Sequence, residues 1–179
     1  MPGRKKTIAV FGTGKAQPGD EVFQLAYEVG KTLAEKGFVV ANGGYAGTML
    51  AAAKGAKEAG GEIVGVTCSA FGPGGANEYV TNEVVTESLN RRLEKLVELG
   101  DAYVVLAGGT GTLLELAYVW EFKNKGFLPA DKPIIIVGRF WRPLTELIDQ
   151  IDPACSRCVK VAEGAEQMVE FLCGFVDES

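Results

Sequence analysis

The chain has 179 residues, of which 24 are glycine and none is histidine, and its formal net charge is −5 at pH 7. With 47% hydrophobic and 23% charged residues, it has the composition of a folded domain rather than of a disordered chain. The absence of histidine excludes Ser-His-Asp and Cys-His catalysis and any metal site that requires imidazole, so proton transfer falls to carboxylates, Lys, Tyr, Cys or bound water.

Short apolar runs alternate along the chain with segments of helical periodicity. Runs rich in Val and Ile predict strands at 8–11, 38–41, 63–66, 103–106 and 134–137, a weaker strand at 158–161, and either a strand or a loop at 79–86. Apolar residues at helical spacing predict helices at about 22–34, 47–59, 88–99, 112–125, 143–150 and 164–175, the first of them between an N-cap at Asp20 and a stop at Gly37.

This order of elements predicts an α/β protein with a three-layer, doubly wound, Rossmann-like fold and a mostly parallel central sheet. Continuous apolar strands suit a parallel sheet that helices cover on both faces. Because no linker, repeat or low-complexity tract divides the chain, we expect one domain over residues 1–179, with residues 1–6 as a flexible tail.

Charge, hydropathy and cysteine spacing argue against several classes of function. The one basic run, at residues 4–6, falls in the expected tail, so we expect no nucleic-acid partner. No apolar run approaches the ~20 residues that span a bilayer, and no apolar signal segment precedes the domain, so we expect no membrane partner and a cytoplasmic protein. Cys155 and Cys158 have CxxC spacing, but without a second pair or a histidine we favour reduced structural cysteines over metal or redox chemistry.

Clusters rich in glycine follow three of the predicted strands, at 12–15 (GTGK), 43–48 (GGYAGT) and 108–112 (GGTGT). The carboxyl ends of parallel strands share one edge of a sheet, where glycines allow close approach and helix N-termini favour anions. Three such loops favour a small phosphorylated ligand over turn geometry alone, although neither a Walker A loop nor G-x-G-x-x-G is present. The candidate binding residues are Thr13, Gly14, Gly43, Gly44, Gly47, Thr48, Gly108, Gly109, Thr110, Gly111 and Thr112.

Two charged residues fall on apolar helix faces. Arg92 lies within the stripe that Leu89, Leu93, Leu96 and Val97 form, whereas Arg91 and Lys95 lie outside it. Glu115 is expected in the first turn of a helix that is apolar nearly all round. A buried arginine needs an anionic partner, either Glu115 or a ligand phosphate. A structural pair is the alternative, but we favour a functional site because both charges flank the same glycine loop.

These residues carry a resemblance to a known family. The segment 108–115 (GGTGTLLE) resembles the P-G-G-x-G-T-x-x-E signature of the LOG family, the cytokinin riboside monophosphate phosphoribohydrolases also called "lysine decarboxylase-like". Residues 43–49 look like its G-G-x-x-G-L-M loop, and Arg92 precedes Asp101 by the spacing of the family's arginine. The similarity spans about residues 7–176. The family's proline is Ala107 here, the lysine after its arginine is Leu93, and two of its glutamates are Leu114 and Tyr118.

The resemblance implies a homodimer that hydrolyses the N-glycosidic bond of a nucleoside 5′-monophosphate to free base and ribose 5-phosphate, without metal or cofactor. It implies that Glu115 and Arg92 are catalytic and that Thr110, Gly111 and Thr112 bind the phosphate. Gly43, Gly44 and Gly47 would shape the nucleotide pocket, with Thr13 and Gly14 at the base or ribose. The alternative is a carrier that binds a nucleotide or a phosphorylated cofactor, such as the molybdenum cofactor, without hydrolysis. Lysine decarboxylation is disfavoured because no lysine lies in a recognisable pyridoxal phosphate setting.

Overall fold

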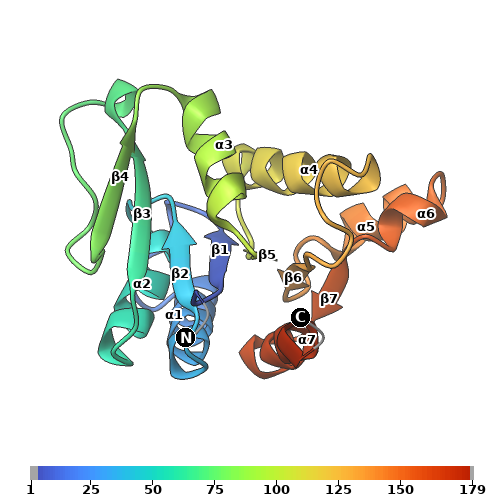
Figure 1. Ribbon diagram of the computed structural model, residues 1–179, viewed down its shortest axis with the longest axis horizontal. Coiled ribbons are helices and arrows are strands. Elements are labelled where there is room, and N and C mark those ends of the chain that lie inside the picture. The colour runs from blue at the N-terminus through green and yellow to red at the C-terminus, as the bar shows by residue number, and fades with distance from the viewer. Residues whose placement is uncertain (1–3, 178–179) are drawn as a thin grey trace.

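A computed structural model describes residues 4–177 of the chain and the side chains of residues 4–174 (Figure 1). The strands are β1 (Thr7–Phe11), β2 (Val39–Asn42), β3 (Ile63–Cys68), β4 (Asn82–Thr86), β5 (Ala102–Val105), β6 (Ile134–Val137) and β7 (Lys160–Ala162). The helices are α1 (Glu21–Glu35), α2 (Thr48–Glu58), α3 (Leu89–Leu99), α4 (Thr110–Asn124), α5 (Arg142–Asp149), α6 (Pro153–Ser156) and α7 (Ala165–Asp177), with a 3₁₀ turn, η1, at Ser69–Phe71.

The strands form one sheet of seven in the order β4-β3-β2-β1-β5-β6-β7. All six pairings between neighbours are parallel, which confirms the doubly wound α/β fold. The chain builds outward from β1 on one side and then returns to start the other side at β5. This reversal between β1 and β5 is the point at which ligands bind in open parallel sheets, outside the carboxyl ends of the strands.

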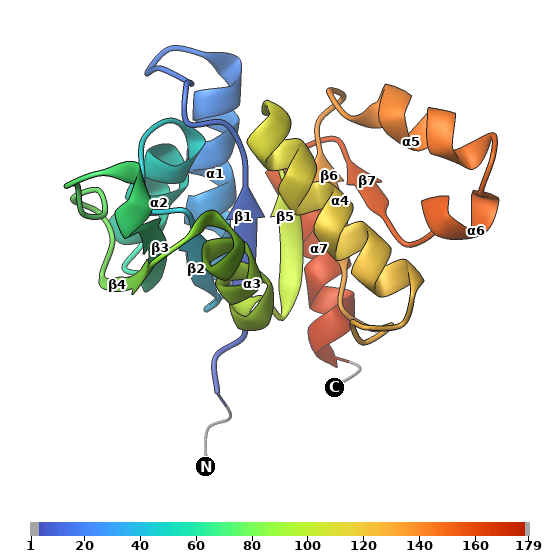
Figure 2. The same cartoon turned by 90° about the horizontal axis from the view of Figure 1, so that it is seen from above.

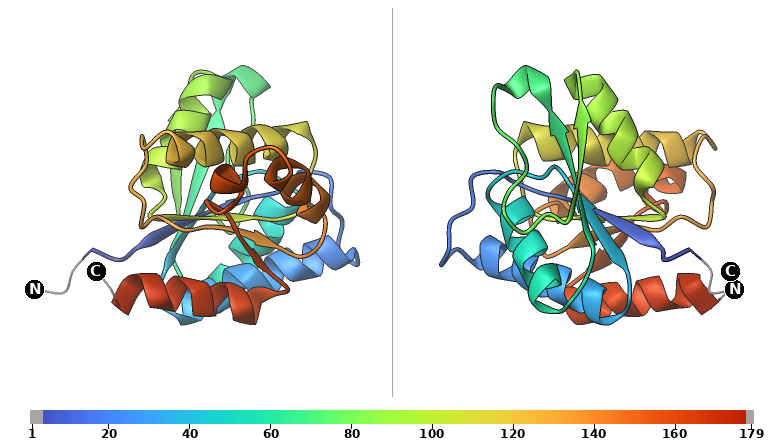
Figure 3. Two further views of the ribbon diagram at one scale, coloured as in Figure 1. Left: turned by 90° about the vertical axis from the view of Figure 1, so that its right-hand side faces the viewer. Right: turned by 60° about the vertical axis from the view of Figure 1, so that its left-hand side comes forward.

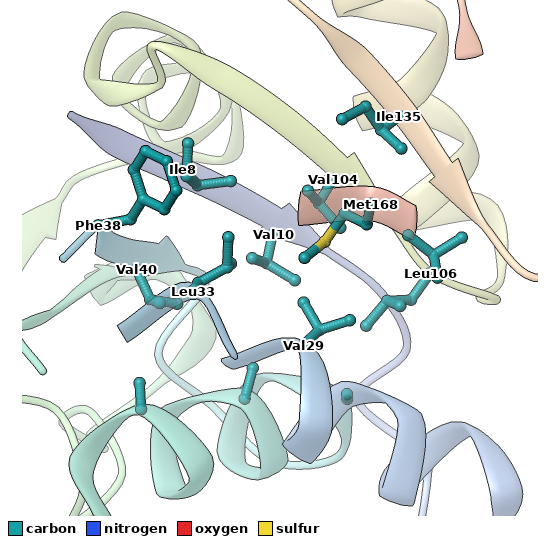
Figure 4. Close-up of a cluster of buried hydrophobic side chains, with 14 of the residues drawn as sticks. Ile8, Val10, Val29, Leu33, Phe38, Val40, Val104, Leu106, Ile135 and Met168 are labelled. Atoms are coloured by element: carbon teal, nitrogen blue, oxygen red, sulfur yellow. The ribbon is translucent and has the colours of Figure 1, made fainter. Parts of the chain in front are cut away.

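Helices cover both faces of the sheet, as the continuous apolar strands predict. Alternate residues of a strand point to opposite faces, so in β1 Ile8 and Val10 pack with α1, α2 and α7, whereas Ala9 and Phe11 pack with α3 and α4. The two helical layers are seen on either side of the sheet in Figures 2 and 3. In Figure 4, side chains of β1, β2 and β5 point toward Val29 and Leu33 of α1.

The elements differ from the expected ones mainly at their ends. The ambiguous segment 79–86 contains strand β4, and the weak strand expected at 158–161 begins only at residue 160. The loop signal at residues 152–153 precedes the short helix α6. Asp20 occupies the N-cap position of α1, but its carboxylate accepts from the Gln17 N–H at 2.7 Å and so closes the preceding turn instead of capping the helix.

The N-terminal segment lies against the sheet over the residues that the structure describes. Arg4 and Lys5, expected in a flexible tail, form ion pairs with Asp101 and Glu62, both at 2.6 Å. The remainder of the expected tail, residues 1–3, lies outside the described residues. The pairs are at the surface, where each contributes little to stability.

Candidate active site at the carboxyl edge of the sheet

The three glycine-rich loops follow β2, β1 and β5, which are direct neighbours in the sheet. The first two loops are tied together, because the Thr48 N–H and hydroxyl both donate to the Thr13 carbonyl, at 2.9 and 3.0 Å. Thr48, predicted to bind the ligand, is buried, and its hydroxyl bonds to the protein instead. Gly14, from the first loop, is exposed. Gly47 has φ +66°, and a Cβ there would overlap with the Thr13 carbonyl, so only glycine fits this contact.

Arg92 reaches this edge from α3, and its side chain is only 10% exposed. Its Nε donates to the Val66 carbonyl at 2.8 Å, and its Nη1 lies 3.8 Å from Oε1 of Glu115. The face of α3 that bears Leu93, Leu96 and Val97 is buried beside it, which confirms the predicted stripe except that Leu89 is half exposed. The separation from Glu115 is too long for a hydrogen bond, so the carboxylate can still accept a bond from a ligand or a water.

Gly43 lies directly under the Arg92 guanidinium. A Cβ at this position would overlap with Nη2 and the central carbon of the guanidinium, and also with the Met49 sulfur. The first glycine of the second cluster is therefore needed for the arginine to reach Glu115, a close approach that only a residue without a side chain allows.

We expect Gly43→Ala to lower the affinity for a small phosphorylated ligand at least tenfold while the protein stays folded. The added methyl group must displace the guanidinium from this site, and losing a hydrogen bond to a charged group costs about 1.5–3 kcal/mol, which is about tenfold or more in affinity. The matched control is Gly164→Ala, because a Cβ there meets nothing within 4 Å. Calorimetric titration with AMP measures the affinity, alongside a thermal melt; equal affinities in the two variants would contradict the steric argument.

Glu115 is on α4 and its side chain is 14% exposed. Burial raises the pKa of this carboxyl from 4.5 to about 7, while the positive charge of Arg92 acts in the opposite direction. The helix begins at Thr110 rather than at the expected residue 112, so Glu115 stands in the second turn and not in the first. A carboxyl that titrates near neutral pH can take up and release a proton under physiological conditions.

The N-terminus of α4 opens at the same edge. The first helical hydrogen bond is donated by the Leu113 N–H to the Gly109 carbonyl at 2.9 Å, so the N–H groups of the three preceding residues come before the helical ladder. Of these residues Thr110 and Gly111 are exposed, whereas Thr112 is buried with its side chain against Gly108. Helix N-termini of this kind favour anions.

Glu115 also makes the stability of the fold depend on pH. Its folded pKa of about 7 lies above the 4.5 of an unperturbed Glu, so from pH 4.5 to 7 the unfolded chain releases a proton that the folded protein retains. Stability from this group is therefore present below pH 4.5 and is lost as the pH rises through 7. Glu115→Gln removes this titration. We therefore expect the unfolding free energy of the variant, relative to that of the wild type, to rise by up to about 3 kcal/mol when the pH is raised from 4 to 8. Urea denaturation of both proteins at each pH measures the two unfolding free energies. A difference between them that does not change with pH would contradict the raised pKa of Glu115.

Two aromatic residues that the sequence analysis did not select complete the surroundings of Arg92. Its guanidinium carbon lies 5.5 Å from the ring centre of Tyr45 and 5.9 Å from that of Phe71. Tyr45 is in a loop and Phe71 ends the short 3₁₀ turn η1, and no periodicity marks either residue. The available signal was that Tyr45 lies inside the second glycine cluster and that Phe71 follows a strand at the same edge of the sheet.

Cys155 lies within α6, and Cys158 follows that helix. Both are unpaired and pack against the apolar cluster on the α3 and α4 side, and the Trp120 indole N–H donates to the Cys155 carbonyl at 2.8 Å. Among the side chains that the structure describes, those of residues 4–174, no three Cys, Asp or Glu gather as possible metal ligands. Over the same residues, none of the helices combines the length and the apolar character needed to cross a bilayer. The homodimer and the cytoplasmic location stay predictions.

Several known proteins are similar to this chain in sequence and in fold. A cytokinin riboside 5′-monophosphate phosphoribohydrolase of Mycobacterium tuberculosis is 36% identical over 134 residues, which cover 73% of this chain and 70% of that protein. The solved structure of the molybdenum cofactor binding protein of Rippkaea orientalis aligns with a TM-score of 0.81 at 27% identity, over 97% of this chain and 98% of that one. For the molybdenum cofactor carrier protein of Chlamydomonas reinhardtii the TM-score is 0.74 at 27% identity, over 97% and 99% of the two chains.

The family model described as the SLOG cluster4 family matches residues 5–166, which is most of the chain. The match includes all three glycine-rich loops together with Arg92 and Glu115. The sequence and the fold therefore agree, and the chain belongs to the SLOG cluster4 family of LOG-like proteins.

Proposed function

We propose that the protein is a nucleoside 5′-monophosphate phosphoribohydrolase, which hydrolyses the N-glycosidic bond to release free base and ribose 5-phosphate. The observation that carries this proposal is the pair of Arg92 and Glu115, 3.8 Å apart and largely buried at the carboxyl edge of the sheet. A buried carboxyl with a pKa of about 7 suits a group that exchanges a proton during a reaction.

Cleavage of an N-glycosidic bond passes through a cationic, oxocarbenium-like state at the ribose C1′. In the proposed reaction the bonding pair leaves with the base nitrogen, and a water oxygen bonds to C1′. The Glu115 carboxylate stabilises the developing positive charge and takes the proton that the attacking water loses. The departing base nitrogen takes a proton from solvent water, and Glu115 then returns its own proton to the solvent, so the cycle consumes one water and no net proton. Arg92 favours the ionised form of Glu115, although burial has the larger effect on the pKa of this carboxyl. The position of the arginine is fixed, because its Nε donates to the Val66 carbonyl.

The substrate phosphate is proposed to bind at the N-terminus of α4. Thr110 and Gly111 are exposed there and precede the helical hydrogen-bond ladder, so their N–H groups suit phosphate oxygens. Glu115 follows one turn later on the same helix, and this spacing brings a sugar held by its 5′-phosphate near the carboxylate. Gly109 and Gly14, both exposed at the same edge, leave room for the ribose.

A carrier function is the second candidate, and the solved structures favour it. The molybdenum cofactor binding protein with a TM-score of 0.81 aligns over nearly the whole of both chains. The polar residues that the phosphoribohydrolase signature has at positions 93, 114 and 118 are Leu93, Leu114 and Tyr118 here. In this reading a phosphorylated cargo binds at the same edge of the sheet, and Arg92 and Glu115 hold it without bond cleavage.

Incubation of the purified protein with AMP, GMP, CMP and UMP separates the two functions. The hydrolase proposal expects release of free base and ribose 5-phosphate from at least one of the four, detected by chromatography. Calorimetry with the same four nucleotides measures binding in parallel. Binding of a nucleotide without release of base from any of them would overturn the hydrolase and support the carrier.

A further inference from the structure

An exposed aromatic side chain lies beside the buried Arg92 and is not used by the reaction proposed above. Phe71 ends the short turn η1 after β3 and is 56% exposed. Its ring centre lies 5.8 Å from that of Tyr45, with the two planes tilted by 47°. Both rings lie within 6 Å of the guanidinium carbon of Arg92. The two rings therefore form an aromatic wall, Tyr45 and Phe71, that continues directly from the charged pair.

The Tyr45 side of this wall is fixed by hydrogen bonds. The Tyr45 hydroxyl accepts from the Cys68 N–H at 2.7 Å, which holds the ring at the carboxyl end of β3. The Asn77 amide donates to the Tyr45 carbonyl at 2.8 Å and to the Gly44 carbonyl at 3.1 Å, so the segment after η1 is fastened to the second glycine loop. A ring held in this way can contact a ligand with little loss of side-chain freedom.

The Phe71 side is fastened to the edge strand β4. The Glu83 carboxylate accepts from the Ala76 N–H at 3.0 Å and from the Thr67 hydroxyl at 2.7 Å. The Ser69 hydroxyl donates to the Thr86 carbonyl at 3.2 Å. The segment that carries Phe71 is thus tied to the sheet at both ends, even though its apolar ring faces solvent.

An open hollow of about 420 Å³ lies against the wall and is lined by Tyr45, Phe71, Gly72, Pro73 and Gly74. Apart from the Tyr45 hydroxyl, which is already bonded to Cys68, none of these side chains has a hydrogen-bonding group. The lining therefore suits the face of a flat ring rather than its polar edge. Stacking of this kind accepts different bases, because every base has a π-face.

We propose that Tyr45 and Phe71 bind the planar heterocycle of the ligand by stacking, with the sugar and phosphate extending past Arg92 toward α4. This proposal rests on the proposed function in taking a nucleotide as the ligand. It assigns the recognition of the base to Tyr45 of the second glycine loop and to Phe71, which lies outside the three loops. Because a fused ring buries more apolar area against an aromatic side chain than a single ring does, we expect the wall to favour purines over pyrimidines.

The test compares AMP with ribose 5-phosphate, which has the same sugar phosphate but no base. Binding of both is measured by calorimetry in the Glu115→Gln background, where turnover is blocked. Phe71→Ala is expected to weaken AMP binding about tenfold and to leave ribose 5-phosphate binding unchanged. Phe71→Tyr is expected to restore AMP binding, because it restores the ring. The matched control is Phe127→Ala, an aromatic residue that is 73% exposed near the other end of α4.

The outcomes separate this proposal from the proposed function. Unchanged AMP affinity in Phe71→Ala, or equal weakening of both ligands, overturns the stacking wall whatever the wild type does to AMP. A selective loss of AMP affinity supports the wall even where the wild type releases no base, a result that overturns only the hydrolase. A wild type that binds AMP no more tightly than ribose 5-phosphate also overturns the wall.

Discussion

Replacing Glu115 with Gln is expected to lower the rate of base release from a nucleoside 5′-monophosphate by a factor of about 100 to 10,000. The amide keeps the size of the carboxyl, but it cannot take a proton from water or carry the negative charge that stabilises a cationic ribose. Single-turnover assays with enzyme in excess, followed by chromatography of the free base, measure the chemical step directly. Binding of AMP should change far less than the rate, because the proposed role is in the transition state.

The matched control is Glu121→Gln, six residues further along α4. The Glu121 side chain is exposed and lies 3.7 Å from Lys125 in a surface ion pair, so its loss should leave the rate within a factor of two. Wild-type rates in Glu115→Gln would remove the carboxylate from the proposed chemistry. If the wild type and both variants bind AMP but release no base, the pair serves binding and the carrier function takes precedence.

The fold could be predicted from the sequence because the central strands of the sheet have a clear apolar signal. The runs at 8–11 and 134–137 are short, rich in Val and Ile and apolar throughout, as expected of strands that helices cover on both faces. The edges were less predictable. β4 pairs only with β3, and its residue Val85 is exposed. Because an edge strand is less covered than a central one, its sequence has a weaker apolar signal, and the segment 79–86 was compatible with a loop as well as with a strand.

The charged pair was also predictable, and for a physical reason. A charge within an apolar helical stripe is costly unless it has a partner, so Arg92 indicated an anionic partner, either Glu115 or a ligand phosphate. The structure brings Arg92 within 3.8 Å of Glu115. The aromatic wall left no such trace, because Tyr45 and Phe71 are in separate loops whose meeting depends on the pairing of β2 with β3. The internal role of the Thr48 hydroxyl was hidden in the same way, since its partner, the Thr13 carbonyl, belongs to another loop.

Arg92→Ala is expected to lower kcat/KM for base release at least 100-fold, whereas Arg91→Ala leaves it nearly unchanged. The two arginines are neighbours on α3, but Arg92 is buried beside Glu115 and Arg91 is exposed, where it pairs with Glu94 at 2.7 Å. Loss of Arg92 removes a fixed positive charge from beside the Glu115 carboxylate and from beside Tyr45 and Phe71. Steady-state kinetics on both variants at pH 7.5 measure the contrast, and equal losses would contradict a specific role of Arg92 in the reaction.

The pH dependence of the rate distinguishes a positioning role of Arg92 from a purely structural one. Burial raises the pKa of Glu115 to about 7 and Arg92 lowers it, so a rate that needs the carboxylate rises with pH through about 7 in the wild type. Without the arginine the opposing charge is gone, and the midpoint should move upward by about one pH unit. Arg92→Lys keeps the charge but not the planar contact with the Val66 carbonyl, so its midpoint should stay near 7 while its rate falls. An unshifted midpoint in Arg92→Ala would show that Arg92 does not act through Glu115.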